Sequence, residues 1–174
     1  MQLTSRLSRP AAVLSDNHAM MNEFTLHTEV WLPRPRDEVF AFFADARNLD
    51  ALTPPWVKFA MLTPGLIEMQ AGTLIDYSIR VHGIPIRWRT EITEWQPPHH
   101  FVDRQLRGPY TLWHHTHTFE ELNGGTLCLD HVRYRPRGGA LVHWLFVRRD
   151  VERIFTYRQY RLKQLFPPAP PHQA

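Results

Sequence analysis

The fold is decided by residues 110–134, which read YTLWHHTHTFEELNGGTLCLDHVRY. Apolar and polar residues alternate over Tyr110–Leu122 and again over Thr126–Tyr134, on either side of the turn signal Asn123-Gly124-Gly125. Alternation puts every second side chain on one face of a strand, and a short glycine-containing connection joins antiparallel neighbours. The stretch therefore predicts a β-hairpin with one apolar face.

The same alternation recurs toward the N-terminus, in runs that are separated by Gly or Pro turn signals. Short connections of this kind indicate an antiparallel meander. After the first run, the apolar spacing changes to that of a helix and then of a second short helical turn. The predicted strands are Phe24–Leu32, Val57–Thr63, Thr73–His82, Ile86–Trp95 and His100–Leu106, and the helical positions are Val39, Phe42, Phe43 and Ala46, followed by Leu49 and Leu52.

Toward the C-terminus, Ala140–Phe166 contains neither Gly nor Pro and predicts a helix of roughly 27 residues, about 40 Å long. Arg158 falls on the apolar stripe of this helix, so it must extend its guanidinium to water or pair with a carboxylate. A curved sheet has to bury its inner face, and this helix is the only predicted element large enough to cover it. The predicted stripe is Leu141, Trp144, Val147, Val151, Ile154, Phe155, Leu162 and Leu165.

Composition excludes several classes of protein. The chain has 174 residues, which predicts one domain, and 43% apolar against 21% charged residues argues against wholesale disorder. The single cysteine, Cys128, excludes an internal disulfide framework, and we expect it to be an inert core residue. No apolar run reaches the roughly 18 residues of a transmembrane helix. A net charge of +3 without a basic block predicts no nucleic-acid partner, and we expect a cytoplasmic protein.

The two ends differ in composition from the rest of the chain. Residues 1–21 are predicted to be a disordered N-terminal extension; a weak likeness to a transit peptide and a start at Met20 or Met21 are the alternatives. Residues 22–166 form the predicted folded domain. Residues 167–174 are a predicted Pro-rich C-terminal tail.

Three stretches carry a family resemblance: VWLPRPRDEVFAFFADARNLDALTPPW (30–56), GTLIDYSIRVHGIPIRWRTEI (72–92) and GPYTLWHHTHTFEELNGGTLCLDHVRY (108–134). They resemble the SRPBCC superfamily, which includes START lipid-transfer domains, birch-pollen-allergen-like proteins, polyketide cyclases and coenzyme Q-binding proteins. The likeness is closest to bacterial members, some of which carry cell-division-inhibitor or cyclase/dehydrase-like labels. It implies an α+β helix-grip fold, in which a curved seven-stranded antiparallel sheet wraps around a long C-terminal helix and two short helices follow strand 1. Such a fold commonly leaves a ligand cavity between sheet and helix.

Strand alternation predicts which side chains face that cavity. Trp113 and Phe119 place their strand's apolar face inward, which brings His115 and His117 in with them. The following strand has two readings, with either Leu127 and Leu129 or Asp130, Val132 and Tyr134 inward, and the family pattern favours the second. That pattern also turns Phe101, Asp103 and Gln105 inward. On the two central strands the inward residues are Ile75, Tyr77, Ile79 and Val81, and Ile86, Trp88, Thr90 and Ile92. The predicted ligand-binding residues are Tyr77, Trp88, Gln105, Trp113, His115, His117, Asp130 and Tyr134.

Burying His115, His117 and Asp130 in an apolar cavity is costly unless they bond one another, water or a ligand. They are candidates for a polar anchor, for an acid–base pair, or for a self-satisfied structural cluster. A two-histidine, one-carboxylate metal site is a further interpretation. We expect no metal and no cofactor, because the superfamily as a whole needs no metal and no third histidine shares that face.

We therefore predict that the protein binds a hydrophobic or aromatic small molecule, lipid-, quinone- or polyketide-like, in the cavity. The alternative is a cyclase- or dehydratase-like enzyme that uses His115, His117 and Asp130 for acid–base chemistry, although no catalytic residue is assigned. Binding is favoured because the sequence reveals no pair of titratable groups with clearly opposed environments. A regulator that acts by protein contact is a weaker alternative, and a homodimer is compatible with the sequence.

Overall fold

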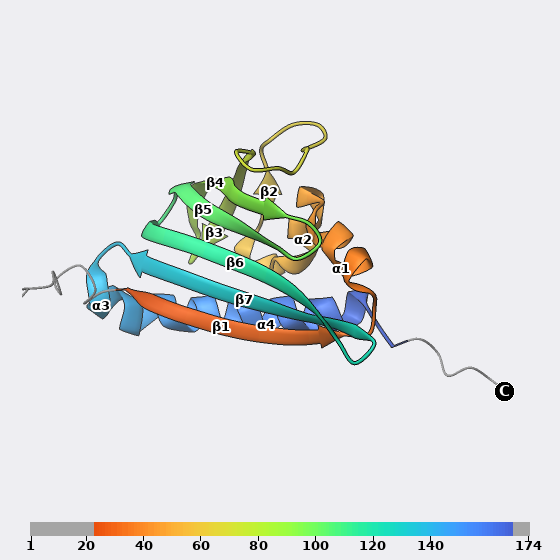
Figure 1. The fold of residues 1–174 in the computed structure, drawn as a ribbon. Coiled ribbons are helices and arrows are strands. Elements are labelled where there is room, and N and C mark those ends of the chain that lie inside the picture. Colours follow the sequence, from red (N-terminus) through yellow and green to blue (C-terminus); the bar gives the residue numbers. More distant parts are fainter. Residues whose placement is uncertain (1–22, 169–174) are drawn as a thin grey trace, which may run out of the picture.

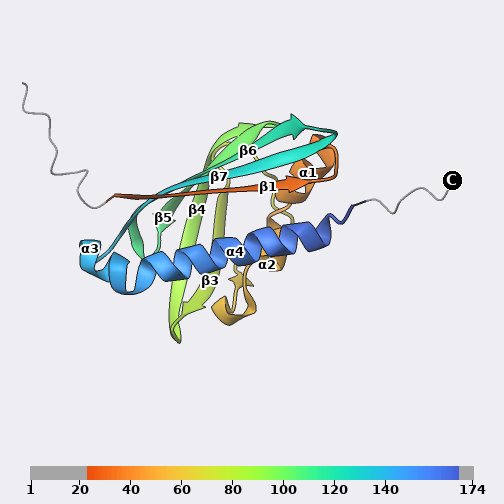
Figure 2. The same ribbon diagram turned by 90° about the horizontal axis from the view of Figure 1, so that it is seen from below.

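The computed structural model describes residues 23–168, which form a curved antiparallel sheet and a long helix that crosses its concave side (Figures 1 and 2). The predicted extension, residues 1–21, lies outside the described residues, as does the predicted tail beyond Pro168. The seven strands lie in the order β1-β7-β6-β5-β4-β3-β2. They are β1 (Phe24–Leu32), β2 (Ala60–Met61), β3 (Leu74–Val81), β4 (Ile84–Gln96), β5 (His100–Arg107), β6 (Tyr110–Leu122) and β7 (Gly125–Pro136).

The helices flank this sheet at two places in the chain. After β1 come α1 (Arg36–Phe43), the 3₁₀ turn η1 (Ala46–Asn48), α2 (Leu49–Leu52) and a second 3₁₀ turn, η2 (Pro55–Val57). After β7 come α3 (Gly139–Val142), the π-helical segment η3 (His143–Val147) and α4 (Arg148–Leu165). The predicted fold class, with two short helices after the first strand, is confirmed.

Left-handed turn residues connect two of the hairpins. Asn123 (φ 50°) and Gly124 (φ 74°) join β6 to β7, and His82 (φ 50°) and Gly83 (φ 83°) join β3 to β4. Two consecutive positive φ angles give a turn whose twist matches that of the flanking strands. The hairpin predicted from Asn123-Gly124-Gly125 is therefore confirmed, with Gly125 as the first residue of β7.

The predicted strand Val57–Thr63 is wrong over most of its length, because only Ala60–Met61 pairs with β3. Pro55–Val57 forms a 3₁₀ turn, and Lys58 has a left-handed φ of 46°, which interrupts an extended chain. The apolar residues of this segment thus pack from a turn.

The long helix exists, but its predicted buried stripe is wrong at both ends. Leu141 is 71% exposed and Trp144 68% exposed, whereas His143 is buried. A π-helical turn holds more residues than an α-helical turn, so the stripe of α4 cannot be extended through η3 with α-helical spacing. At the other end Leu165 is exposed, and Phe166, just after the helix, takes the buried position.

Inside the fold, buried apolar residues form two clusters. The first joins α1 and the C-terminal part of α4 to the sheet, and the second joins the N-terminal part of α4 to β7. Representative members of the first are Leu32, Val39, Phe40, Phe119 and Leu162; the second consists of Val132, Tyr134, Val151 and Phe155.

We predict that Leu162→Ala costs about 2–5 kcal/mol of unfolding free energy, because Leu162 is 1% exposed and its removal leaves a cavity in the first cluster. Leu145→Ala, on the same helix but 62% exposed, should change stability by no more than about 0.5 kcal/mol. Urea titrations of both variants check this. Equal losses would show that the helix presents a different face to the sheet.

Candidate functional site

A cavity of about 640 Å³ lies between the sheet and α4. Its walls are mainly apolar and aromatic, with contributions from both central strands, from β6 and from the helix. Pockets that hold drug-sized ligands have roughly 300–1,000 Å³. The cavity is thus of the size and character expected of a small-molecule site. Wall residues include Ile75, Tyr77, Trp88, Trp113, Ile154 and Phe155.

Strand register gathers charged side chains beside this cavity. Asp103 on β5 is paired with His115 on β6, and His117 on β6 is paired with Asp130 on β7. Because alternate residues share a face, both histidines point inward between the two carboxylates. Arg158 approaches from α4. We call these five residues the polar layer.

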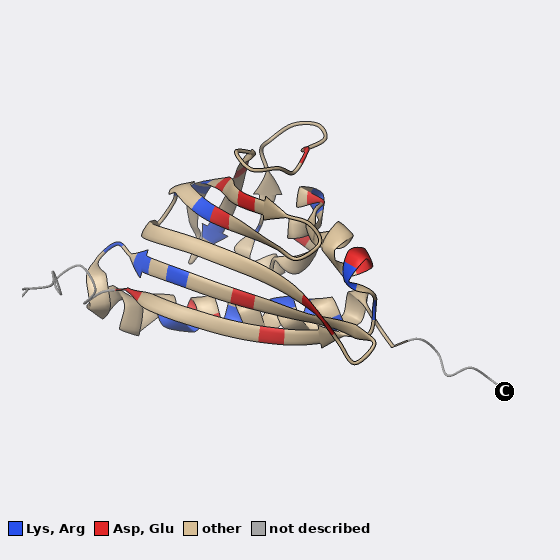
Figure 3. Ribbon diagram, in the orientation of Figure 1, with Lys and Arg blue, Asp and Glu red and all other residues tan. Residues whose placement is uncertain are grey.

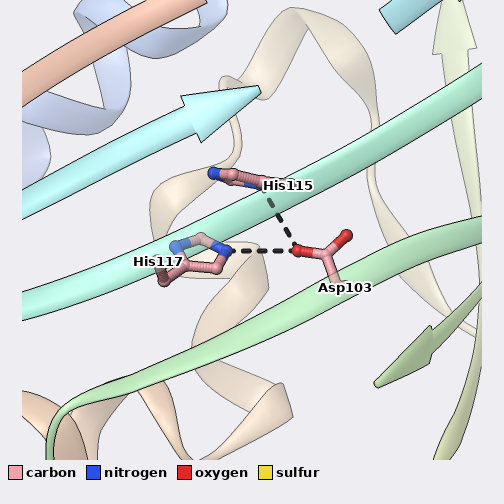
Figure 4. Close-up of side chains that lie close together, drawn as sticks. All are labelled: Asp103, His115 and His117. Carbon is pink, nitrogen blue, oxygen red and sulfur yellow. Dashed lines mark hydrogen bonds and ion pairs between the residues drawn. The ribbon is translucent and has the colours of Figure 1, made fainter. Parts of the chain in front are cut away.

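The contacts within the polar layer are short and mutual. Nδ1 of His115 and Nε2 of His117 lie 3.3 and 3.2 Å from the same Oδ2 atom of Asp103 (Figure 4). The other nitrogens of the two rings, Nε2 of His115 and Nδ1 of His117, lie 3.0 and 2.8 Å from Oδ1 of Asp130. The His115 contact is a hydrogen bond, whereas Nδ1 of His117 lacks hydrogen-bond geometry.

Asp130 is also held from two further elements. Nε of Arg158 lies 3.7 Å from Oδ2 of Asp130, and the hydroxyl of Thr28 on β1 donates a hydrogen bond of 3.4 Å to the same oxygen. The expectation that Arg158 pairs with a carboxylate is therefore confirmed. Its guanidinium also lies 5.2 Å from the centre of the Phe43 ring.

Burial and charge act against each other in the polar layer. Burial alone would raise the pKa of Asp130 and of Asp103, but Arg158 and the histidines outweigh it for Asp130, and the two histidines do so for Asp103. Both carboxyl pKa values are therefore lowered, and both groups are ionised at neutral pH.

The two histidines shift in opposite directions. Burial lowers the pKa of His115, but the charges and hydrogen bonds of Asp103 and Asp130 outweigh it and leave that pKa raised. Burial and the neighbouring charge of His115 lower the pKa of His117. The ring centres are 3.7 Å apart, so two imidazolium ions here would repel strongly. With His115 charged and His117 neutral, two carboxylates balance one imidazolium and Arg158.

The predicted site residues fall into two groups. Tyr77, Trp88, Trp113, His115 and His117 line the cavity. Asp130 is buried behind the histidines and supports them. The reading of β7 with Asp130, Val132 and Tyr134 inward is confirmed, since all three are buried.

Gln105 and Tyr134 are engaged elsewhere. The Gln105 amide donates a 2.7 Å hydrogen bond to the carbonyl of Tyr110 and accepts one of 3.3 Å from its N–H, which closes the turn between β5 and β6. The Tyr134 hydroxyl lies 3.0 Å from Nε2 of His143. Neither side chain is part of the cavity wall.

Sequence reasoning missed Asp103 and Arg158 as members of the site. Strand alternation had turned Asp103 inward, and Arg158 was a charged residue on an apolar helical stripe, so both signals were present. Both residues line the cavity.

A metal ion is a further occupant that the polar layer's donors would suit. One ligand atom each from Asp103, His115 and His117 lies within 4.8 Å of the others. Nitrogen and carboxylate donors of this kind bind zinc or ferrous iron. The carboxylate in this set is Asp103, whereas the sequence interpretation had used Asp130. The charge balance described above needs no metal ion.

Comparison with known proteins gives the family. The family model described as polyketide cyclase/dehydrase and lipid transport matches residues 32–156, most of the chain, so the protein belongs to this family. The SRPBCC resemblance is thereby confirmed. No curated protein sequence matches the chain.

Solved structures of the same fold come from bacteria and plants. The Zhui aromatase/cyclase from Streptomyces sp. R1128 superposes with a TM-score of 0.66 at 16% identity, covering 82% of this chain and 93% of that one. The di-domain ARO/CYC BexL from the BE-7585A biosynthetic pathway gives 0.65 at 18% identity, over 86% of this chain and 52% of that one. Major latex-like protein 151 from Panax ginseng gives 0.63 at 8% identity, over 84% and 99%. At these identities the likeness is one of fold.

We predict that the two buried histidines titrate on opposite sides of the ordinary histidine value of about 6.5, His115 above it and His117 below it. Imidazole nitrogen NMR across pH 4.5–9 would measure both midpoints. In His115→Phe the midpoint of His117 should rise, because it loses a cationic neighbour and keeps both carboxylates. His114→Phe, which alters the next residue, is the control and should change neither midpoint.

The same shifts determine how stability depends on pH. Because the pKa of His115 is raised by folding, its contribution is complete below about pH 6.5 and is lost as pH rises through the raised pKa. The pKa of His117 is lowered, so its contribution is present above about pH 6.5 and declines as pH falls through the lowered pKa. Joint titration of both rings near the ordinary value would contradict this account.

Proposed function

We propose that the protein binds an apolar, ring-containing small molecule in the cavity and holds that molecule's polar group against the polar layer. The observation that carries this proposal is the exposure of buried charged groups to an otherwise apolar cavity. Asp103, His115, His117 and Arg158 all reach the cavity wall while remaining largely buried. Structural ion pairs need no such access, whereas a ligand anchor does.

The aromatic walls favour a planar ligand. The rings of Tyr77 and Trp88 are stacked with centres 5.8 Å apart, and Trp113 meets Trp88 edge-on at 5.3 Å. Tyr110 packs against both tryptophans, at 5.6 and 4.8 Å. Flat aromatic surfaces of this kind pack well against rings or conjugated chains. Burial raises the pKa of Tyr77 and of Tyr110, so both hydroxyls stay neutral hydrogen-bonding groups.

The chemical class we propose is lipid-, quinone- or polyketide-like. Family membership supports this range, because its description joins polyketide cyclases and dehydrases with lipid transport. We further propose that the protein works in the cytoplasm without a nucleic-acid partner, and that a homodimer is compatible with this role. Within residues 23–168, no helix is long and apolar enough to cross a membrane. Cys128 is buried, and its pKa is raised to about 12, as befits a core thiol.

We predict that His117→Phe preserves the fold and weakens binding. The ring of His117 already stacks on Phe101 at 4.2 Å, so a phenyl ring suits the site, and Asp103 and Asp130 keep His115 as a partner. A ligand that loses its polar partner should bind about 1–3 kcal/mol more weakly. Calorimetry with the probe anilinonaphthalene sulfonate, and with any ligand extracted from the purified protein, measures the change.

His114→Phe is the matched control, because His114 lies one residue away on the outer face of β6 and outside the cavity wall. It should leave both affinity and stability unchanged. Unchanged affinity in His115→Phe and His117→Phe, combined with easy unfolding of both, would show that the polar layer is structural only.

A second candidate function, a cyclase- or dehydratase-like enzyme, is favoured by one observation. The structure supplies the pair of opposed titratable groups that the sequence did not reveal: His115 with a raised pKa and His117 with a lowered one. A charged imidazole can donate a proton to a leaving hydroxyl while its neutral neighbour accepts one. Both rings reach the cavity. Protein-contact regulation remains a hypothesis that rests on the labels of some bacterial relatives.

Mass spectrometry of molecules extracted from the purified protein separates the two functions. A cyclase or dehydratase predicts that His115→Phe retains a molecule heavier by one water than the molecule held by the wild type. A pure binding protein predicts the same mass from both. A mass difference that also appears in His114→Phe would exclude the acid–base interpretation.

A further inference from the structure

An exposed apolar surface lies at the N-terminal end of the long helix, and we call it the docking surface. It consists of four side chains from α3 and η3 together with one from the start of β4. Their exposure is far above that of the core residues in the same elements. The members are Leu141 (71%), Trp144 (68%), Leu145 (62%), Phe146 (55%) and Ile84 (64%).

The π-helical segment creates this surface. Because η3 turns His143 inward, where it stacks on Phe24 with ring centres 3.4 Å apart, the following three apolar side chains turn outward. The β3–β4 hairpin lies alongside: the ring of His82 is 6.5 Å from that of Phe146 and its Nε2 is 2.7 Å from Oδ2 of Asp150. Figure 2 shows this end of the helix opposite the end that α2 covers.

Arginines border the docking surface. Arg137, in the turn after β7, and Arg148, Arg149 and Arg153, on α4, are all exposed (Figure 3). The two acidic residues of this segment, Asp150 and Glu152, are paired with His82 and Arg148 respectively. The border therefore carries net positive charge.

The docking surface also adjoins the cavity. Val142 and Val147, which flank its helical members, line the cavity wall together with Arg137, His82 and Gly83. A flat partner seated on the docking surface would therefore lie next to the cavity.

We propose that this surface docks on an anionic lipid bilayer. Trp, Phe and Leu side chains that project from a helix enter the boundary between headgroups and acyl chains, while flanking arginines bind anionic headgroups. A second copy of the chain fits less well, because a two-fold interface here would bring two sets of arginines together. Docking would also let an apolar ligand pass between bilayer and cavity without crossing water, a consequence that rests on the proposed function.

Flotation of the purified chain with vesicles tests the proposal. With phosphatidylcholine vesicles that contain about 30% phosphatidylglycerol, the wild type should bind, and high salt should weaken the binding. Leu145→Glu should reduce the bound fraction at least about fivefold. Leu66→Glu, which alters an 83% exposed leucine in the loop between β2 and β3, is the matched control and should leave binding unchanged.

Charge has its own matched pair on α4. Arg149→Glu should lower binding at least about fivefold, and Lys163→Glu, near the other end of the helix, should not. His117→Phe should retain vesicle binding, so that loss of docking and loss of ligand anchoring are told apart. The proposal is overturned if the wild type does not float, if Leu145→Glu and Leu66→Glu behave alike, or if Leu145→Glu instead abolishes a dimer seen by ultracentrifugation.

Discussion

Asp130 is the residue around which the structure is organised. Its carboxylate is held by His115 and His117 from β6, by Arg158 from α4 and by Thr28 from β1. A buried charge is tolerated only when its partners are present and well placed, and removing one partner of a buried pair typically costs several kcal/mol. The position of α4 against the sheet and the inward direction of both histidines therefore depend on the same carboxylate.

Apolar clusters on either side confine this charge to one layer. Along β7, Cys128 belongs to the first cluster and Val132 to the second, with Asp130 between them. Along α4, Leu162 and Phe155 enclose Arg158 in the same way. The charged groups are thus withdrawn from bulk water on both sides, and their open direction is the cavity. That single opening makes them a ligand anchor in our account.

Much of this architecture could be predicted from the sequence, because strand alternation is local. Parity alone placed His115 and His117 inward beside Trp113 and Phe119, and the choice of parity for β7 came from the family pattern. Parity cannot show which side chain answers which across the fold. Arg158 was therefore known to need a carboxylate, but Asp130 was not known to be that partner, and Asp103 was left out of the site.

The errors have physical causes as well. Helical periodicity assumes α-helical spacing, so the π-helical turn moved Trp144 from the predicted core to the surface. Gln105 has the parity of an inward residue, but the backbone of Tyr110 offers it two hydrogen bonds at a tight turn. Both competing interactions arise from local backbone geometry that residue type does not reveal.

A crystal structure of the protein with a molecule retained from its expression host, or with anilinonaphthalene sulfonate, tests the central claim most directly. The account predicts that the rings of the bound molecule lie against Trp88 and Trp113 and that its polar group lies within hydrogen-bond distance of His115, His117 or Arg158. A bound molecule that turns its apolar end toward these three side chains and its polar group toward solvent would contradict it.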